Sequence, residues 1–329
     1  MSNNKSKGGN KQLHRAKKEK NDEFYTQFTD IERELSHYKD HFKGKTVLCN
    51  CDDPRVSNFF KYFALNFEYF GLKRVITTCY KNNCPDLFSQ NDAEQAVYLI
   101  YDGNNGASMP DWDKVDVKPL RGDGDFRSRE CIELLKQSDI VVTNPPFSLF
   151  REYVAQLMAY HKRFLIIGNQ NEITYKEIFP LIKANRIWLG YNSGNMEFKV
   201  PADSEPRATR YWQDETGQKW RSMGNTCWLT NLEHSKRHEE MILYKHYIPE
   251  EYPKYDNYDA INVDKVKDIP CDYDGVMGVP ITFLDKYCPE QFEIVAQMAN
   301  TNIDEFNYGY PFINGERKYA RVLIRKLNK

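Results

Sequence analysis

Short apolar runs that alternate with helical patterns constrain the fold of this chain more than any other feature of its 329 residues. Four runs have the length and β-branched content of buried strands: KTVLCNC at residues 45–51, RVITTCY at 74–80, DIVVTN at 139–144 and RFLIIGN at 163–169. Helical patterns lie at residues 57–72, 128–138 and 148–161. Strands that are apolar along nearly their whole length and alternate with helices are typical of a parallel sheet covered on both faces. The chain is therefore predicted to be an α/β protein.

The rest of the chain departs from this pattern. Residues 81–118 are polar and loop-rich, and two further strands are predicted at residues 186–190 and 227–232. Five aromatic residues in the first helical pattern recur at helical spacing, which favours a place in the core over a ligand contact: Phe59, Phe60, Phe63, Phe67 and Phe70. From about residue 233 the composition shifts to Tyr, Asp, Pro and Gly. We expect three parts: a basic arm at 1–22, an α/β domain at 23–232 and a smaller region at 233–329.

The first 20 residues contain seven Lys and Arg residues against a single acid, whereas the whole chain has a formal net charge of −1. With Gly, Asn and Ser interspersed, this arm is expected to be flexible in isolation. Such an arm is an electrostatic footprint for nucleic acid, with contacts from residues such as Lys11, Arg15, Lys17 and Lys18. A tail that only aids solubility is the alternative, and the arm alone does not decide between them.

Membrane, disulfide and metal chemistry are not expected. No segment approaches the roughly 18 apolar residues of a membrane span, and the N-terminal stretch lacks the apolar part of a signal peptide. A cytoplasmic protein is the expectation. The eight cysteines are scattered without a Cys-x-x-Cys pair. Cys49 and Cys51 share one face of a predicted strand, but no second pair is placed to complete a zinc site. We therefore expect reduced thiols and no metal.

Three unusual polar segments are expected at one edge of the predicted sheet. In an open parallel α/β sheet, ligands bind outside the carboxyl ends of the strands. The segments are CDDPRVSN at residues 51–58, RGDGDFRS at 121–128 and NPPF at 144–147. Functional groups concentrate in loops that a rigid sheet holds in place. Their coincidence predicts a ligand site at this edge.

The NPPF turn has the chemistry of a receptor for an amine on a flat ring. Pro145 and Pro146 fix two successive φ angles and lack N–H donors. The Asn144 side-chain oxygen and the Pro145 carbonyl would then form a fixed pair of acceptors for the two N–H groups of an amine. Phe147 would offer a face on which the ring can stack. An ordinary turn that ends a strand, with an incidental Asn, is the alternative at this point.

A strand followed by (N/D)PP(F/Y) is the signature of S-adenosylmethionine-dependent amino methyltransferases, and NPPF is most typical of those acting on adenine N6 in DNA. The chain closely resembles EcoRI-type adenine-specific DNA methyltransferases. The matching segments run from about residue 11 into the C-terminal region: DEFYTQFTDIERELSHY, CNCDDPRVSNFFKYFA, GDGDFRS, SDIVVTNPPFSLF, FLIIGN, WLTNL, YPKYDNYDAINV and GVMGVPITFL. The resemblance implies a Rossmann-like methyltransferase sheet in residues 23–232 and a target-recognition region in residues 233–329.

The resemblance also implies where the cofactor binds. Tyr25 and Thr26 correspond to the N-terminal cofactor motif of this class. The loop with Cys51, Asp52 and Asp53 falls where the first loop cradles the methionine part of the cofactor. The Gly-x-Gly of the general methyltransferase pattern is absent there, so the atoms that this loop offers are left open.

The cofactor adenine is assigned to a second loop by the same resemblance. Asp125 falls where an acid usually accepts a hydrogen bond from the adenine amine, and Phe126 would pack on the ring. Asp123 is the competing acid. The acid that usually holds the cofactor ribose is not evident after Tyr80, and that role is unassigned.

The implied reaction transfers a methyl group from S-adenosylmethionine to N6 of an adenine in double-stranded DNA and leaves S-adenosylhomocysteine. The target base must first flip out of the duplex. Phe147 would stack on it, with Phe198 or Tyr175 as further partners, and Arg207 and Arg210 would contact the DNA. Direct in-line displacement requires neither a metal nor a covalent enzyme intermediate.

The resemblance further implies GAATTC as the target, with methylation of the inner adenine. It implies a monomeric enzyme of a prokaryote or phage, paired with a restriction endonuclease in a restriction-modification system. Two other functions stay open: the same fold acting on RNA adenine or a protein glutamine, and a catalytically silent DNA-binding homologue. The basic arm and Phe147 favour a base over an amide, and the intact NPPF argues against a silent protein.

Overall fold

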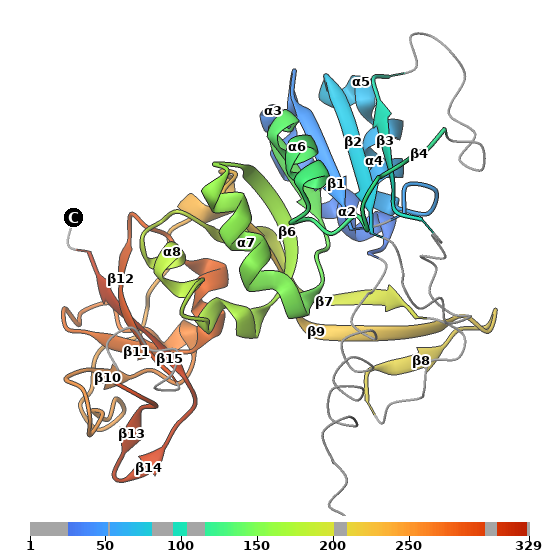
Figure 1. The fold of residues 1–329 in the computed structure, drawn as a ribbon. Coiled ribbons are helices and arrows are strands. Elements are labelled where there is room, and N and C mark those ends of the chain that lie inside the picture. Colours follow the sequence, from blue (N-terminus) through green and yellow to red (C-terminus); the bar gives the residue numbers. More distant parts are fainter. Residues whose placement is uncertain are drawn as a thin grey trace, which may run out of the picture.

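The computed structural model describes residues 26–51, 53–80, 95–103, 116–200, 209–299 and 308–327. Its main feature is a nine-stranded sheet. In sheet order the strands are β4 (Lys118–Pro119), β3 (Val97–Tyr101), β2 (Arg74–Cys79), β1 (Thr46–Asn50), β5 (Ile140–Thr143), β6 (Arg163–Asn169), β9 (Lys219–Thr230) and β7 (Trp188–Lys199), with β8 (Tyr211–Gln213) paired to β9. Together with the helices around it, this sheet confirms the predicted α/β class (Figure 1).

The sheet is parallel only at its centre. β2, β1, β5 and β6 run parallel, as predicted from their apolar runs. β3, β4, β7, β8 and β9 all pair antiparallel to their neighbours, so the expectation of a wholly parallel sheet is corrected to a mixed one. At this edge β9 runs antiparallel to both β6 and β7, through pairings between residues that are distant in the chain. β3 and β4 lie in the stretch predicted to be loop.

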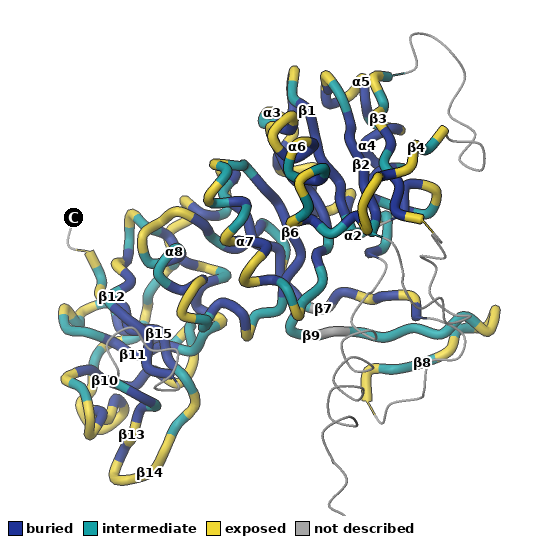
Figure 2. Tube along the Cα trace, viewed as in Figure 1, coloured by how far each residue is buried: buried dark blue, intermediate teal, exposed yellow. Residues whose placement is uncertain are grey.

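Helices cover both faces of the sheet because alternate strand residues point to opposite sides. Val47 and Cys49 of β1 belong to one buried cluster, whereas Leu48 belongs to the other. The first cluster is closed by α2 (Phe28–Leu35), α3 (Lys39–Phe42), α4 (Asn58–Leu65) and α5 (Phe67–Phe70). The second is closed by α6 (Arg129–Gln137), α7 (Phe150–Ala159) and α8 (Phe179–Lys183). Figure 2 shows the central strands buried along their length.

The phenylalanine stripe lies in the core, as predicted. All five of its rings are at most 7% exposed: Phe59, Phe60, Phe63, Phe67 and Phe70. The predicted single helix is divided at Asn66 into α4 and α5. Ser57 begins α4 by accepting a hydrogen bond from the Phe60 N–H, an N-cap that satisfies an otherwise unpaired donor. Gly71, with φ of 59°, ends α5 in the left-handed conformation that glycine adopts easily.

The strands β7 and β9 are much longer than predicted and extend from the sheet as a ribbon (Figure 1). Glu34 of α2 fixes the base of this ribbon. Its carboxylate accepts the N–H groups of Tyr191 and Asn192 at 2.7 and 2.8 Å, and the Tyr38 hydroxyl at 2.8 Å. Burial raises the pKa of Glu34, and these bonds partly offset that rise. The helix that follows the N-terminal arm therefore sets the direction of the ribbon.

The C-terminal region forms a second, four-stranded sheet. Its order is β10 (Ile261–Asn262), β11 (Met277–Val279), β15 (Arg321–Lys326) and β12 (Phe292–Met298), and β13 (Phe312–Ile313) pairs separately with β14 (Glu316–Arg317). Phe292 and Ile294 of β12 share one buried cluster with Phe179 and Ile182 of α8. The two sheets are thus joined through a continuous core, and the division near residue 233 stays a prediction.

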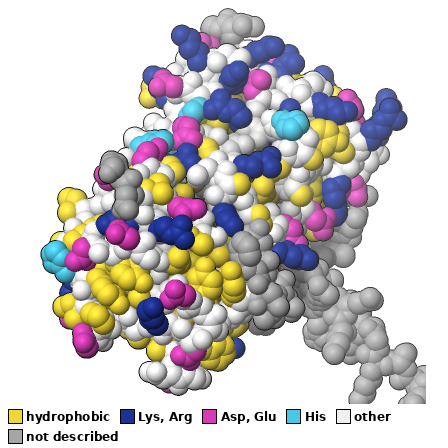
Figure 3. Space-filling model, turned by 90° about the vertical axis from the view of Figure 1, so that its left-hand side faces the viewer, with side chains coloured by type: hydrophobic (Ala, Val, Ile, Leu, Met, Phe, Trp, Pro, Cys, Tyr) yellow, Lys and Arg dark blue, Asp and Glu magenta, His cyan; other side chains and the backbone are white. Residues whose placement is uncertain are grey.

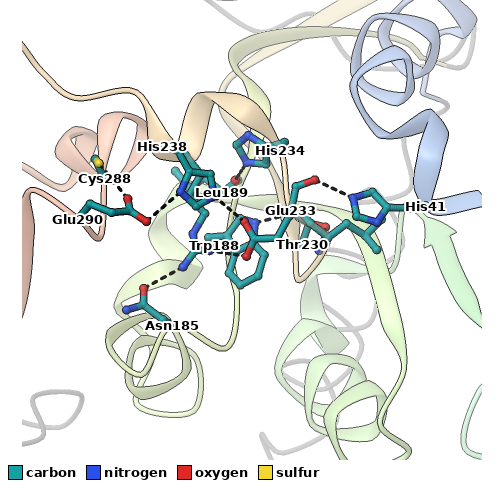
Figure 4. A network of polar contacts seen from close by, with 12 residues as sticks. His41, Asn185, Trp188, Leu189, Thr230, Glu233, His234, His238, Cys288 and Glu290 are labelled. Carbon is teal, nitrogen blue, oxygen red and sulfur yellow. Dashed lines mark hydrogen bonds and ion pairs between the residues drawn. The ribbon is translucent and has the colours of Figure 1, made fainter.

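A polar network joins the parts of the chain around that predicted boundary (Figure 4). The Arg237 guanidinium lies 3.8 Å from the centroid of the Trp188 ring, forms an ion pair with Glu233 at 2.5 Å and donates to Asn185 at 3.1 Å. His238 bridges Glu233 and Glu290 at 3.1 and 3.0 Å. Residues 233–238 therefore connect β7 to the C-terminal sheet by contacts, and not only by the chain.

The described residues contain neither a membrane-spanning helix nor a disulfide. None of their helices has the length and apolar character to cross a membrane. Seven cysteines lie within the described ranges, and all seven are free thiols.

Candidate active site

The carboxyl ends of β1, β2, β5 and β6 meet at one edge of the sheet because these strands are parallel and in register. Cys49 pairs with Thr77 in β2, and Thr143 at the end of β5 pairs with Ile166 in β6. The chain segments that follow β1 and β5 are two of the predicted site loops. The third predicted loop also reaches this edge, through Gly124.

Cys51, directly after β1, has a φ of 90°, in the left-handed region that favours glycine. Its N–H donates to the Thr78 carbonyl of β2 at 3.0 Å. Such a conformation costs about 1–3 kcal/mol and persists where the surrounding structure fixes it. Two hydrogen bonds do so here: the Asn50 side chain accepts from the Tyr153 hydroxyl, and the Asn50 carbonyl accepts from the Thr143 hydroxyl. The first loop lacks Gly-x-Gly, yet its backbone at Cys51 adopts the positive φ that glycine favours, which we call a glycine-like turn.

Thr26 lies next to this first loop. The Asn58 side chain, at the start of α4, donates to the Thr26 carbonyl at 2.8 Å. The Thr26 hydroxyl is buried and hydrogen-bonds to no described residue. A buried hydroxyl with such spare capacity is normally explained by a ligand, an ion or a water. Thr26 of the N-terminal motif thus contacts the end of the first loop, and their shared role in a cofactor site stays a prediction.

Asp53, the described acid of the first loop, is buried and already has hydrogen-bond partners. Asp53 is 4% exposed, and its carboxylate already accepts the N–H of Arg55 at 2.9 Å and pairs with the Arg55 guanidinium at 3.2 Å. This arrangement shapes the turn that leads into α4. Tyr25 and Asp52 lie outside the described residues.

Gly124 brings the third loop to the carboxyl end of β2. It has a φ of 79°, and a Cβ at this position would lie 2.4 Å from the Cys79 carbonyl oxygen and 2.7 Å from the Tyr80 Cα. Only glycine allows so close an approach with that φ. The thiol of Cys131 in α6 donates to the Gly124 carbonyl at 3.5 Å and holds the loop from the other side.

The two acids of this loop differ in their partners. Asp125 is held by Arg127 through two side-chain hydrogen bonds, at 2.7 and 2.9 Å, and these bonds lower the pKa of its carboxyl. Asp123 is exposed and accepts the Asp125 N–H through one oxygen at 3.0 Å. Of the two, Asp123 has the more accessible carboxylate. Phe126 is 8% exposed and packs edge-on against Tyr153, with ring centroids 5.1 Å apart.

The NPPF turn follows β5 where the chain leaves the sheet. Pro145 is buried, whereas Asn144, Pro146 and Phe147 are each half-buried. Phe147 opens the short helix η4 (Phe147–Leu149) and packs against the buried cluster on the α4 side of the sheet. The prolines therefore lie between a fully buried strand and a helical turn, which restrains the backbone on both sides.

Three polar residues beside this turn were not predicted. Asn169 ends β6, and its side-chain oxygen accepts from Asn225 of β9 at 2.8 Å. Glu172 of η5 (Gln170–Thr174) accepts the Asn169 N–H at 2.8 Å, is 3% exposed, and has a pKa that burial raises to about 8. A Cβ at Gly168 would lie 2.9 Å from the Glu172 carboxylate, so the glycine leaves room for this acid. In the sequence, the polar run GNQNE at residues 168–172, where β6 ends, is the signal that could have indicated a site here.

The remaining predicted residues are dispersed. Tyr175 is half-buried, with the Arg151 guanidinium 5.2 Å from its ring centroid. Phe198 is fully buried, at 0% exposure, so its ring offers no free face for a base. Arg210 is exposed at the start of β8. Arg207 and the arm residues Lys11, Arg15, Lys17 and Lys18 lie outside the described residues.

Charge is mixed on the described part of the face that Figure 3 presents. Figure 3 shows Lys and Arg side chains interspersed with Asp, Glu and apolar groups on the face that it presents. This agrees with the formal net charge of −1. Attraction of a polyanion must therefore come from local basic segments and not from the net field of the protein.

Comparisons with known proteins match nearly the whole chain. The family described as adenine-specific methyltransferase EcoRI matches residues 12–327. The type II methyltransferase M.EcoRI of Escherichia coli is 54% identical over 320 residues, which cover 96% of each chain. M.MgeORF184P of Mycoplasma genitalium is 40% identical and M.MpnI of Mycoplasma pneumoniae 38%; each alignment covers 95% of this chain and 98% of the relative. No solved structure matches significantly. The chain belongs to the EcoRI family of adenine-specific methyltransferases.

Proposed function

We propose that this methyltransferase flips an adenine out of double-stranded DNA and transfers a methyl group from S-adenosylmethionine to its exocyclic N6. The observation that carries the proposal is the NPPF turn at the end of β5, at the same sheet edge as the loops around Cys51 and Gly124. An amine receptor and two cofactor-type loops at one edge are the arrangement that such a transfer needs.

The residues at this edge fit S-adenosylmethionine. The buried Thr26 hydroxyl has unused hydrogen-bonding capacity, and Asp123 offers an accessible carboxylate for the adenine amine of the cofactor. Phe126 would pack on the adenine ring, and the glycine-like turn at Cys51 would lie along the methionine part. When bound, the cofactor supplies an electrophilic methyl group on its sulfonium.

Asn144 and Pro145 would hold the target amine. The Asn144 side-chain oxygen and the Pro145 carbonyl accept its two N–H bonds, which draws the nitrogen lone pair out of conjugation with the ring. The nitrogen would thereby become more nucleophilic towards the methyl group that the cofactor supplies. Pro146 keeps both acceptors in place, since it restricts φ and offers no competing N–H. Positioning and electrostatics are then the main sources of rate.

Flipping the adenine costs a few kcal/mol, which contacts in the pocket must offset. Phe147 is the proposed stacking partner, and Tyr175, a half-buried ring directly after η5, is a second one. Stacking on an aromatic side chain contributes roughly 1–3 kcal/mol per base. Phe198 is left out of this proposal because its ring is fully buried.

Phe147→Ala is expected to weaken binding of the flipped base, because the stacking face is lost. The measurement is the fluorescence of 2-aminopurine at the target position, which rises when the base leaves the stack. We expect a smaller rise with Phe147→Ala than with wild type, and Phe147→Tyr should preserve it. An unaltered signal in a folded Ala variant contradicts the stacking role.

DNA contacts are proposed for three parts of the chain. The arm at residues 1–22 would contact phosphates through its Lys and Arg residues. In the 23–232 catalytic domain, Arg210, which is exposed directly before β8, would add a further contact, and the same is proposed for Arg207. Residues 233–329 would form the target-recognition region. From the resemblance to the EcoRI-type family, we propose GAATTC-like specificity, a monomer, a paired restriction endonuclease and a cytoplasmic location in a prokaryote or phage-infected cell.

Deleting residues 1–20 is expected to lower DNA affinity and to flatten its dependence on salt. Each phosphate contact that is lost reduces the slope of log K against log salt concentration by about 0.9. The measurement is DNA binding by fluorescence anisotropy at several salt concentrations. An unchanged slope would mean that the arm is only solvated.

The substrate class is tested with labelled S-adenosylmethionine on four substrates: a duplex with GAATTC, the same duplex with the site scrambled, the matching RNA and a glutamine-containing peptide. We expect label in the GAATTC duplex alone. Equal label in both duplexes would overturn the specificity, and label in RNA or peptide would overturn the substrate class. No label with any substrate would indicate a silent homologue.

A further inference from the structure

Three side chains of the kinds that bind transition metals converge in the C-terminal region, away from the sheet edge described above. They are His246, Cys271 and Asp272, and their ligand atoms all lie within 4.8 Å of one another. We propose that they form a binding site for a divalent transition metal ion of the Zn²⁺ type. Imidazole, thiolate and carboxylate together are a zinc ligand set, whereas Mg²⁺ and Ca²⁺ prefer oxygen ligands alone.

The distances suit a tetrahedral ion. His246 Nδ1 lies 2.9 Å from Asp272 Oδ2 and 3.8 Å from Cys271 Sγ. Zinc bonds of roughly 2.0–2.3 Å place neighbouring tetrahedral ligand atoms about 3.3–3.6 Å apart. Both His246 distances lie within about 0.5 Å of this spacing, and Cys271 Sγ and the Asp272 oxygen lie within 4.8 Å of each other, so side-chain rotation would be needed to bring all three atoms around one ion.

The backbone already holds the two segments that carry the ligands. Lys245 and Pro270 form a parallel β-bridge, and the Cys271 N–H donates to the Lys245 carbonyl at 2.8 Å. Asp272 uses one carboxylate oxygen to accept the Tyr247 N–H at 2.8 Å and directs the other to His246. Such outer contacts orient metal ligands before the ion arrives. An incidental ion pair between His246 and Asp272 would not require the second Asp272 oxygen to be bound to the backbone.

The charges and exposure around the cluster also permit binding. The His246 and Asp272 side chains are 75% and 47% exposed, so an ion can enter and a water molecule can take the fourth position. Lys326 donates to the Cys271 carbonyl and lies 3.9 Å from Asp274. The positive charge of Lys326 is therefore partly balanced by Asp274, which is not one of the proposed ligands.

A bound ion would join a segment before β10 to a segment before β11, across 25 residues of chain. Binding to the folded state alone raises stability by mass action. The inference is independent of the methyl-transfer proposal, because none of these residues lies in that site.

The test uses the full-length protein after removal of metals with a chelator. Titration with Co²⁺ should give one equivalent bound, with a sulfur-to-cobalt charge-transfer band in the near ultraviolet that Zn²⁺ removes. Zn²⁺ should raise the thermal unfolding midpoint by several degrees. Cys271→Ser should abolish the band, and His246→Gln should weaken Zn²⁺ binding by at least about tenfold.

Two matched variants keep the test specific. Cys288→Ser and His161→Gln remove a thiol and an imidazole outside the cluster, and both should bind Co²⁺ as wild type does. Unfolding midpoints measured without metal show whether each variant is folded. Absence of the band in wild type, or a band that survives in folded Cys271→Ser, would overturn the proposal.

Discussion

Replacing Asn144 with alanine is expected to lower the rate of methyl transfer by about 100- to 1000-fold, while binding of S-adenosylmethionine is retained. The estimate follows from the loss of one fixed hydrogen-bonding group at a reacting centre. Without the Asn144 side-chain oxygen, the amine would keep one acceptor, the Pro145 carbonyl, and its lone pair would stay conjugated with the ring. Single-turnover rates on a GAATTC duplex and calorimetric titration with the cofactor measure the two quantities.

Asn144→Asp is the matched variant, because a carboxylate keeps an acceptor oxygen at the same place and the wider motif allows either residue. We expect it to retain more activity than the alanine variant. The half-buried position makes a fold effect of the substitution small, and the unfolding midpoint checks this. A wild-type transfer rate in Asn144→Ala contradicts the assignment of this residue.

Replacing Glu172 with glutamine is expected to change how stability depends on pH. Burial raises the pKa of Glu172 from 4.5 to about 8 in the folded protein. An acid with a raised folded-state pKa contributes stability that is fully present below about pH 4.5. That contribution is lost as pH rises towards about 8, because the unfolded state ionises first. The shift corresponds to a free energy on the order of 4–5 kcal/mol.

Glutamine keeps an acceptor for the Asn169 N–H but cannot ionise. Relative to wild type, Glu172→Gln should therefore become progressively more stable between pH 5 and pH 8. Glu177→Gln is the control, since Glu177 lies close by in the chain but is partly exposed, 3.9 Å from Arg151. The measurement is urea unfolding of the three proteins at both pH values. A stability difference between Glu172→Gln and wild type that does not change with pH would mean that the acid is not buried as described.

The central strands and the NPPF turn could be predicted because their signals are local. An apolar run such as residues 139–144 is buried on both faces wherever it lies in a parallel sheet, and two prolines end it. The antiparallel flanks could not be predicted in the same way. The pairing of β6 with β9 joins residues about 60 positions apart, and no local pattern states its direction.

The differences at single residues also have physical causes. Phe198 was expected beside the target base, but Met196 and Phe198 of β7, together with Val200 directly after the strand, belong to one buried cluster. Glu172 was not singled out in the sequence, because an acid after a strand is usually exposed. Its burial depends on the space that Gly168 leaves, which is a tertiary property.

At Cys51 the structure defines a backbone conformation that the sequence left open. The absent Gly-x-Gly left the first loop undefined in the sequence, whereas the structure gives this cysteine a φ of 90°. Contacts from Tyr153 and Thr143 to Asn50 hold the turn, and both residues come from other elements. The backbone geometry of the loop is thus set by neighbours that are distant in sequence.

The most direct test of the proposed transfer is to find the methyl group on the DNA. A GAATTC duplex is incubated with the enzyme and labelled S-adenosylmethionine, digested to nucleosides and analysed by mass spectrometry. We predict N6-methyladenine at the inner adenine of the site as the sole labelled nucleoside, and its near absence with Asn144→Ala. Label in another nucleoside, or N6-methyladenine formed equally by the Asn144 variant, would contradict the role of the NPPF turn as the receptor of the adenine amine.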